Sequence, residues 1–125
     1  LRFQDGATMK EVGRGKGDIF WAAYPVELAE GTAPATEVYN YVLGRVGIAP
    51  AFTLAAPLPA GVLIYATVLQ DAVLYVMASD SADDVSIDLR DGETGARLNV
   101  ALPSQHAAMA LIGLLDKTVI AKYGF

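Results

Sequence analysis

The chain has 125 residues, of which 54% are hydrophobic and 18% are charged, and this composition excludes an intrinsically disordered segment. Its formal net charge of −5 at pH 7 argues against a nucleic-acid partner, because binding to phosphate backbones requires clustered Lys and Arg side chains. The sequence contains no cysteine, which excludes disulfides, thiolate metal sites and a cysteine nucleophile, and no apolar run approaches the roughly 18 residues of a membrane helix.

The first part of the chain predicts a β-hairpin. Residues 7–12 and 17–24 have the composition of strands, and three glycines at residues 13–17 permit positive φ angles in the turn between them. The second strand is apolar on both faces and therefore needs cover on both sides. It ends at Pro25, which has no N–H to donate to a ladder. We therefore expect this chain to be a piece of a larger protein whose neighbouring parts supply that cover.

A helix is predicted over residues 34–46. Thr32 or a neighbour caps its start, Pro34 fits its first turn, and Gly47 stops it. Apolar side chains recur at helical spacing and predict one buried face: Val38, Tyr39, Val42, Leu43 and Val46.

Three prolines in residues 49–59 predict an extended connector, beyond which the hydrophobic period changes from helical to strand-like. We therefore divide the chain into residues 1–48, a hairpin plus a helix, and residues 49–125, an antiparallel β-domain. Strands are expected at 62–69, 72–79, 85–90, 96–102, 106–115 and 118–123. Short strands at roughly even spacing, with turn residues between them, indicate a sandwich or barrel. The predicted fold class is mainly β: an antiparallel β-sandwich of about six to eight strands with an N-terminal hairpin and one α-helix.

The glycine-rich turn at residues 13–18 superficially resembles a phosphate-binding loop. Neither a G-x-x-x-x-G-K-[ST] nor a G-x-G-x-x-G spacing fits it, and a strand follows where a helix N-terminus is required. A hairpin turn is the favoured interpretation, with Arg14 and Lys16 as solvated turn charges.

Carboxylates offer two candidate sites. Glycoside hydrolysis needs two carboxyl groups about 5 to 9.5 Å apart, and Glu27 and Glu30 form the one pair that flanks a turn behind an aromatic strand. We favour a Glu27 that anchors the loop and an exposed Glu30. Asp80, Asp83 and Asp84 cluster as oxygen ligands for calcium would. They match no known loop spacing, so a solvated acidic turn is favoured.

His106 is the only histidine, and neither a metal site nor a catalytic triad can be completed around it, so a surface role is favoured. Four aromatic residues, Trp21, Tyr24, Tyr65 and Tyr75, are candidates for a platform on which sugar rings stack. Because they lie in strands that are apolar on both faces, core or interface packing is the favoured role.

Several segments together resemble the C-terminal accessory region of bacterial multidomain glycoside hydrolases of the β-galactosidase or cellulase-like type. Residues 13–21 read Gly-Arg-Gly-Lys-Gly-Asp-Ile-Phe-Trp, residues 24–30 read Tyr-Pro-Val-Glu-Leu-Ala-Glu, and a short helix follows around residues 38–43. The strands at 72–79 and 85–90 resemble the small antiparallel β-domain that ends such proteins. The resemblance covers most of the chain, and its motifs are structural.

The resemblance implies that residues 1–48 are the remnant of an α/β accessory domain and that a catalytic barrel lies upstream. The catalytic carboxylates of such a parent have no counterpart here, so no catalytic residue is assigned. Because the rest of the α/β domain is absent, Ile19, Trp21 and Val42 are expected to lack their native cover.

The resulting prediction is a non-catalytic C-terminal module of a glycoside hydrolase, which packs against the parent enzyme or oligomerises it. The alternative is a carbohydrate-binding module that contacts a glycan through Trp21, Tyr24 and Glu27. An independent hydrolase is least favoured, because no nucleophile, base and orienting group can be assembled. The expected partners are the upstream catalytic domain, carbohydrate or a second copy, without nucleic acid, membrane, metal or cofactor. The resemblance implies a secreted or periplasmic parent, while the residues themselves leave the compartment open.

Overall fold

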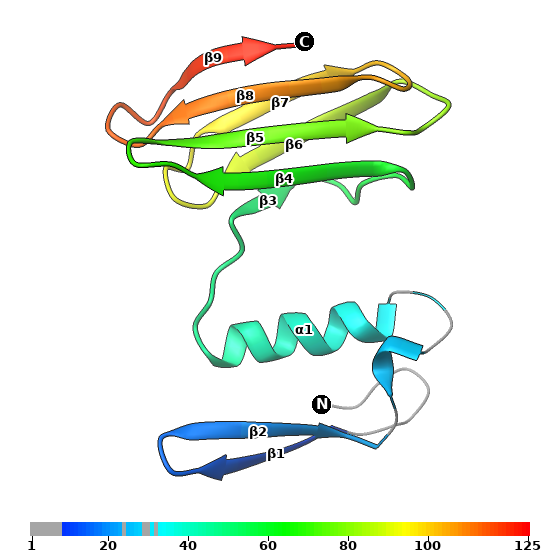
Figure 1. Ribbon diagram of the computed structural model, residues 1–125, viewed down its shortest axis with the longest axis vertical. Helices are drawn as coiled ribbons and strands as arrows, with labels where there is room; N and C mark the ends of the chain where they lie inside the picture. Colours follow the sequence, from blue (N-terminus) through cyan, green and yellow to red (C-terminus); the bar gives the residue numbers. More distant parts are fainter. Residues whose placement is uncertain (1–8, 24, 29–30, 32) are drawn as a thin grey trace. The chain divides into compact units, whose positions relative to one another are not determined.

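The computed structural model describes residues 9–23, 25–28, 31 and 33–125. The chain divides into two compact units, Leu1–Ala49 and Pro50–Phe125 (Figure 1). The described residues form three antiparallel sheets, one α-helix and one short 3-10 helix. The predicted fold class, a mainly β protein with an N-terminal hairpin and a single α-helix, is confirmed.

The first unit begins with a hairpin of β1 (Met9–Arg14) and β2 (Gly17–Ala22). Gly15 has a φ of +66°, the left-handed conformation that the turn requires and that glycine adopts without steric cost. The 3-10 helix η1 (Val26–Leu28) and the helix α1 (Ala33–Arg45) follow.

One face of this hairpin packs on α1. Phe20 of β2 meets Tyr41 of α1 edge to face, with ring centroids 6.1 Å apart. Glu11 of β1 accepts hydrogen bonds from the Tyr41 hydroxyl and from Arg45 Nε, both at 2.9 Å. Arg45 Nη2 also forms an ion pair with Glu11. These contacts, apolar and ionic, fix the helix against the hairpin.

The second unit is a β-sandwich. Its three-stranded sheet has the order β3 (Phe52–Leu54), β6 (Val85–Asp91), β7 (Arg97–Leu102). Its four-stranded sheet has the order β4 (Val62–Val68), β5 (Ala72–Ser79), β8 (Ala107–Gly113), β9 (Val119–Tyr123). Figure 1 shows the two sheets stacked face to face. The segment 49–59, expected to be a connector, thus contains a short strand, whose three residues pair with the edge of β6.

The core lies between these sheets and is built by alternate residues of the strands. On β6 and β7 the inward side chains are Val85, Ile87, Leu89, Leu98, Val100 and Leu102, and all are buried. From the other sheet come Val73, Tyr75, Met77, Ala108, Ala110 and Ile112. The core packing expected for Tyr75 is confirmed, since its side chain is fully buried. Tyr65, by contrast, is 61% exposed and lies outside the core.

Candidate functional site

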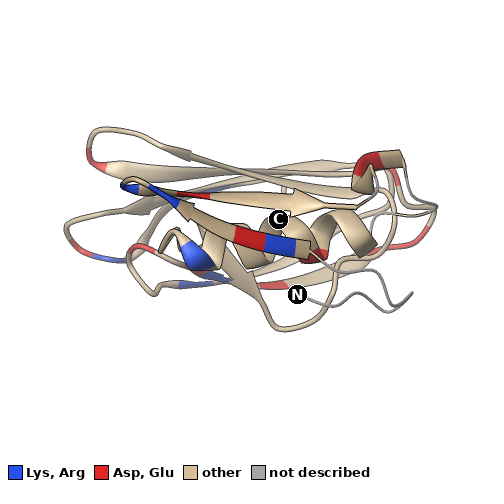
Figure 2. Ribbon diagram, turned by 90° about the horizontal axis from the view of Figure 1, so that it is seen from below, with Lys and Arg blue, Asp and Glu red and all other residues tan. Residues whose placement is uncertain are grey.

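The outward face of the four-stranded sheet carries almost no polar group. Its positions alternate with the core residues, and the strand register brings them together as one surface, which we call the apolar sheet face. It consists of Leu63, Tyr65, Thr67, Leu74, Val76, Ala78, Ala107, Met109, Leu111, Ala121 and Tyr123. None of these residues is charged, and Thr67 is the one aliphatic hydroxyl among them. Figure 2 shows Lys, Arg, Asp and Glu residues dispersed over strands, the helix and turns of the described chain.

One row crosses all four strands of this face. Tyr65 pairs with Val76, Val76 with Met109, and Met109 with Tyr123. Tyr65, Met109 and Tyr123 are 61%, 41% and 71% exposed. A shallow hollow of about 240 Å³ is lined by residues of β5, β8 and β9, which include Met109 and Tyr123 of the row and one charged residue, Lys122. A contiguous exposed apolar surface of this kind is uncommon on a soluble monomer and marks an interaction site.

The outward face of the three-stranded sheet is the opposite in character. Its residues are Thr53 of β3, Ser86, Asp88 and Arg90 of β6, and Arg97, Asn99 and Ala101 of β7. Six of these seven side chains are polar or charged, which is the usual alternation of an antiparallel sheet with one face in water. The sandwich thus has one outer face suited to water and one that is not.

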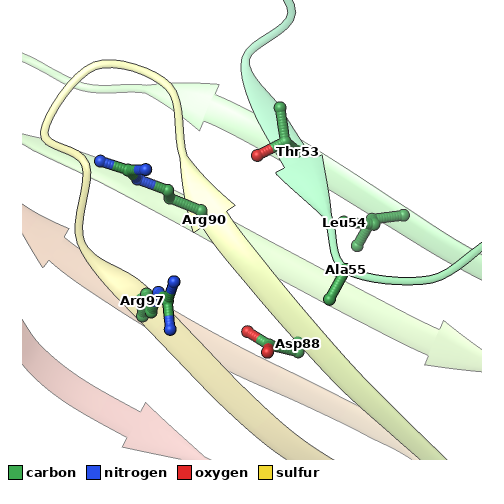
Figure 3. Close-up of a pocket in the computed structure, with 6 residues that line it drawn as sticks. All are labelled: Thr53, Leu54, Ala55, Asp88, Arg90 and Arg97. Carbon is green, nitrogen blue, oxygen red and sulfur yellow. The ribbon is translucent and has the colours of Figure 1, made fainter.

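The polar face contains a pocket of about 140 Å³ (Figure 3). It is lined by Thr53, Leu54, Ala55, Asp88, Arg90 and Arg97. Arg90 and Arg97 are direct partners across β6 and β7, and Thr53 is the partner of Arg90 on β3. The sequence did not reveal this cluster, because the register of β3 on β6 brings its members together.

In the first unit, the face of the hairpin that points away from α1 carries exposed apolar side chains beside two cations, Lys10 and Arg14. Ile19 and Trp21 are 48% and 54% exposed, and Lys10 Nζ lies 5.9 Å from the centroid of the Trp21 ring. Among the described residues of this unit only Met9 is buried, and α1 contains no buried residue. Val42 is half-buried. This unit therefore lacks a closed core of its own in the part that the structure describes.

Glu27 has a structural contact. It accepts a hydrogen bond from the hydroxyl of Tyr39, which joins η1 to α1, and this bond is the main cause that raises the pKa of Tyr39. The expected anchoring role of Glu27 thus agrees with its contact. Tyr24 and Glu30, the other members of the candidate sets, lie outside the described residues.

The remaining candidates for chemistry are held by local contacts. His106 is exposed, and its Nδ1 lies 2.7 Å from the carbonyl oxygen of Ser104. Asp84 Oδ1 accepts a hydrogen bond of 2.9 Å from the Ser104 amide. Among the residues that the structure describes, no group of three His, Cys, Asp or Glu side chains is arranged to hold a metal ion.

A buried polar cluster surrounds Asp91. Acidic residues in strands and turns usually face water, but Asp91 at the end of β6 is 1% exposed. Its Oδ1 accepts a 2.5 Å hydrogen bond from the Tyr75 hydroxyl, and its Oδ2 accepts two of 2.6 Å from the amide and hydroxyl of Thr94. The Tyr75 hydroxyl also lies 3.2 Å from the Ala51 carbonyl. Asp and Thr side chains in turns commonly bond to nearby groups, and the presence of Asp91 and Thr94 three residues apart is the one signal in the sequence.

The pKa values of this pair follow from burial and hydrogen bonding. Burial, and then the bond to Asp91, raise the pKa of Tyr75. Burial alone would raise the pKa of Asp91, but hydrogen bonds from Thr94 and Tyr75 outweigh it and lower that pKa. Each carboxylate oxygen has a partner, so the cluster acts as a structural clamp on the β6–β7 turn.

Comparison with protein-family models, with curated proteins and with solved structures finds no match for this chain. Within the described residues, no helix has both the length and the apolar character needed to span a membrane. The function is therefore inferred from the surfaces and contacts described above.

Proposed function

We propose that the chain is a non-catalytic module of a bacterial glycoside hydrolase and that it packs on another domain of that enzyme. The observation that carries the packing role is the apolar sheet face, with its uncharged row from Tyr65 to Tyr123. The class of the parent enzyme is supported by the sequence resemblance at residues 13–30.

The contrast between the two outer faces supports this role. Both faces belong to the same sandwich and cover one core. The overall composition of the chain and its environment are therefore the same for both, and neither explains why only one face is apolar. Only the face of the three-stranded sheet has the polar side chains of a water-exposed surface. The apolar sheet face instead has the uncharged composition found at the centre of protein interfaces.

A charge introduced at the centre of the apolar sheet face tests the packing role. In Met109→Lys, an ammonium group replaces a thioether in the middle of the row, and the matched control is Asn99→Lys on the opposite face. We expect the isolated chain to bind an apolar dye and the separately expressed catalytic domain. Met109→Lys should weaken both by about tenfold or more, the effect of a buried unpaired charge, and Asn99→Lys should change neither.

Two results decide between occupants of the face. Binding to the catalytic domain with a monomeric chain in analytical ultracentrifugation supports packing within the parent enzyme. A dimer that Met109→Lys dissociates, without binding to the catalytic domain, points to a second copy and overturns the proposal. A monomer that binds neither the dye nor the catalytic domain also overturns it. Hydrolysis of an aryl glycoside by the isolated chain would contradict its non-catalytic role.

The second candidate function is carbohydrate binding through the hairpin. The observation that favours it is the exposed ring of Trp21, since flat aromatic rings stack on the apolar faces of sugars. Calorimetry with neutral oligosaccharides tests it. If an oligosaccharide binds, and Trp21→Ala abolishes the binding while Tyr65→Ala leaves it intact, this function is supported. If none of the oligosaccharides tested binds, carbohydrate binding is excluded for those sugars.

A further inference from the structure

Two arginines lie next to each other on the polar face of the sandwich. Arg90 and Arg97 occupy directly opposed positions on β6 and β7, and Thr53 of β3 pairs with Arg90. Side chains at such positions share one face with Cβ atoms about 5 Å apart, and like charges there destabilise the strand pair. A negative group near the two arginines would therefore stabilise this arrangement.

Asp88 is the carboxylate that lines the same pocket as the two arginines, but it forms no ion pair with either of them. The one ion pair among the described residues joins Arg45 to Glu11 in the first unit. The second unit has eight acidic residues and four basic ones, so carboxylates are plentiful there. Two of the four cations nevertheless lie side by side without an ion pair to a described carboxylate. Asp88 offsets part of the repulsion between them, and an anionic ligand bound between the arginines would offset the remainder.

The pocket beside the arginines offers more than positive charge. Its six lining residues include Asp88, two residues before Arg90 on β6, and Thr53, which carries a hydroxyl group (Figure 3). Leu54 and Ala55 add apolar surface. Its volume of about 140 Å³ suits a small polar group with a few attached carbon atoms.

We propose that this pocket binds a carboxylate with neighbouring hydroxyl groups, the chemistry of a sugar acid. The planar guanidinium groups of Arg90 and Arg97 match the two oxygens of a carboxylate. Asp88 accepts hydrogen bonds from hydroxyl groups of the ligand, and Thr53 both accepts and donates them. The negative charge of Asp88 also disfavours a doubly charged phosphate. This site is separate from the apolar sheet face and does not depend on the proposed packing.

NMR titration of the full chain tests the proposal. The Nε–H signals of Arg90 and Arg97 report contact at the guanidinium groups, and the probe is D-glucuronate. D-glucose lacks the carboxylate, acetate lacks the hydroxyls, and inorganic phosphate replaces the carboxylate by another anion. We expect glucuronate to shift both signals and to bind about tenfold more tightly than acetate or phosphate, the effect of one or two added hydrogen bonds. Glucose should shift neither signal.

Three variants separate the site from general electrostatics. Arg97→Gln should weaken glucuronate binding by about tenfold or more, since it removes a charged hydrogen-bond donor. Arg90→Lys, which keeps the charge and loses the planar fork, should weaken it severalfold. Lys117→Gln removes one charge from the same unit, outside the pocket, and should leave the affinity unchanged. Amide spectra of each variant check that the fold is intact.

The proposal is overturned if glucuronate shifts neither arginine signal, or if acetate or phosphate binds as tightly as glucuronate. Equal losses in Lys117→Gln and Arg97→Gln would also overturn it, because they would reveal non-specific attraction to positive charge. Because the readout uses only the pocket arginines, these results are independent of whether the chain packs on a glycoside hydrolase.

Discussion

Tyr75 of β5 donates a hydrogen bond of 2.5 Å to Asp91 of β6, so a buried polar contact joins the two sheets of the sandwich. The contact also reaches the chain entering β3, because the Tyr75 hydroxyl lies 3.2 Å from the Ala51 carbonyl. Thr94 completes the coordination of the carboxylate from within the β6–β7 turn. This cluster therefore specifies how the sheets, the turn and the incoming chain fit together.

Removal of the Tyr75 hydroxyl should destabilise the sandwich. Tyr75→Phe leaves Asp91 Oδ1 without its partner in a site closed to water. We expect a loss of about 1–3 kcal/mol in the free energy of unfolding, the cost of an unsatisfied buried polar group. Urea denaturation measures it. Tyr65→Phe removes an exposed hydroxyl and should stay within about 0.5 kcal/mol of the parent chain; equal effects of the two changes would refute the clamp.

The clamp should also make stability depend on pH. The folded-state pKa of Asp91 is lowered, so its contribution is present above the unfolded-state pKa of about 3.9 and is lost as the pH falls through the folded-state value. We expect the melting temperature to fall on acidification below about pH 4. Asp91→Asn should melt lower at neutral pH and show a shallower acid dependence. Asp71→Asn, at an exposed position, is the control and should leave the acid dependence of the melting temperature unchanged. If Asp91→Asn also left it unchanged, Asp91 would not be its source.

Close backbone packing gives a prediction at Gly92. A Cβ atom there would lie 2.6 Å from the carbonyl oxygen of Pro50 and 2.9 Å from that of Ala51. Gly92→Ala must therefore displace the chain entering β3, and we expect about 1–3 kcal/mol of destabilisation. Glu93→Ala, an exposed change in the same turn, should cost about 0.5 kcal/mol or less. Thermal unfolding of both variants measures the difference, and equal melting temperatures would show that the contact is relaxed without cost.

The attachment of α1 to the hairpin should respond to pH as well. The pKa of Glu11 is lowered, first by its hydrogen bond with Arg45 and then by that with Tyr41. The resulting stabilisation is present above the unfolded-state pKa of about 4.3 and is lost as the pH falls. Glu11→Gln should speed hydrogen exchange of the α1 amides at neutral pH. The carboxylate of Glu37 makes no hydrogen bond to a described residue, so Glu37→Gln should not speed this exchange. Faster exchange in Glu37→Gln than in Glu11→Gln would contradict the role of Glu11.

Local patterns predict much of this fold. The strict alternation at β6 and β7 identified both strands and their inward residues, because a strand with one buried face repeats every two residues. The same alternation extends to Asp91, although a carboxylate is rarely found at an inward position. The sequence period was the better guide, since the hydrogen bonds that make burial tolerable come from residues elsewhere in the fold.

Long-range pairing was not predictable from the sequence. β3 has only three residues and follows a proline-containing segment, so its pairing with β6, some thirty residues away, leaves no local signal. The arginine pocket depends on that pairing. The apolar sheet face was predictable in part, because both sets of alternate residues in β4 and β5 are mainly apolar. Which of the two sets faces outward is determined by the stacking of the sheets.

The two outer surfaces of the sandwich point in opposite directions, because each sheet turns its other side to the shared interior. A partner that binds at Tyr65 and Tyr123 therefore does not cover Arg90 and Arg97, which lie on the other outer face. Any acidic ligand held there would be displayed on the opposite side of the sandwich, and its arrival would neither compete with nor require binding at Tyr65 and Tyr123.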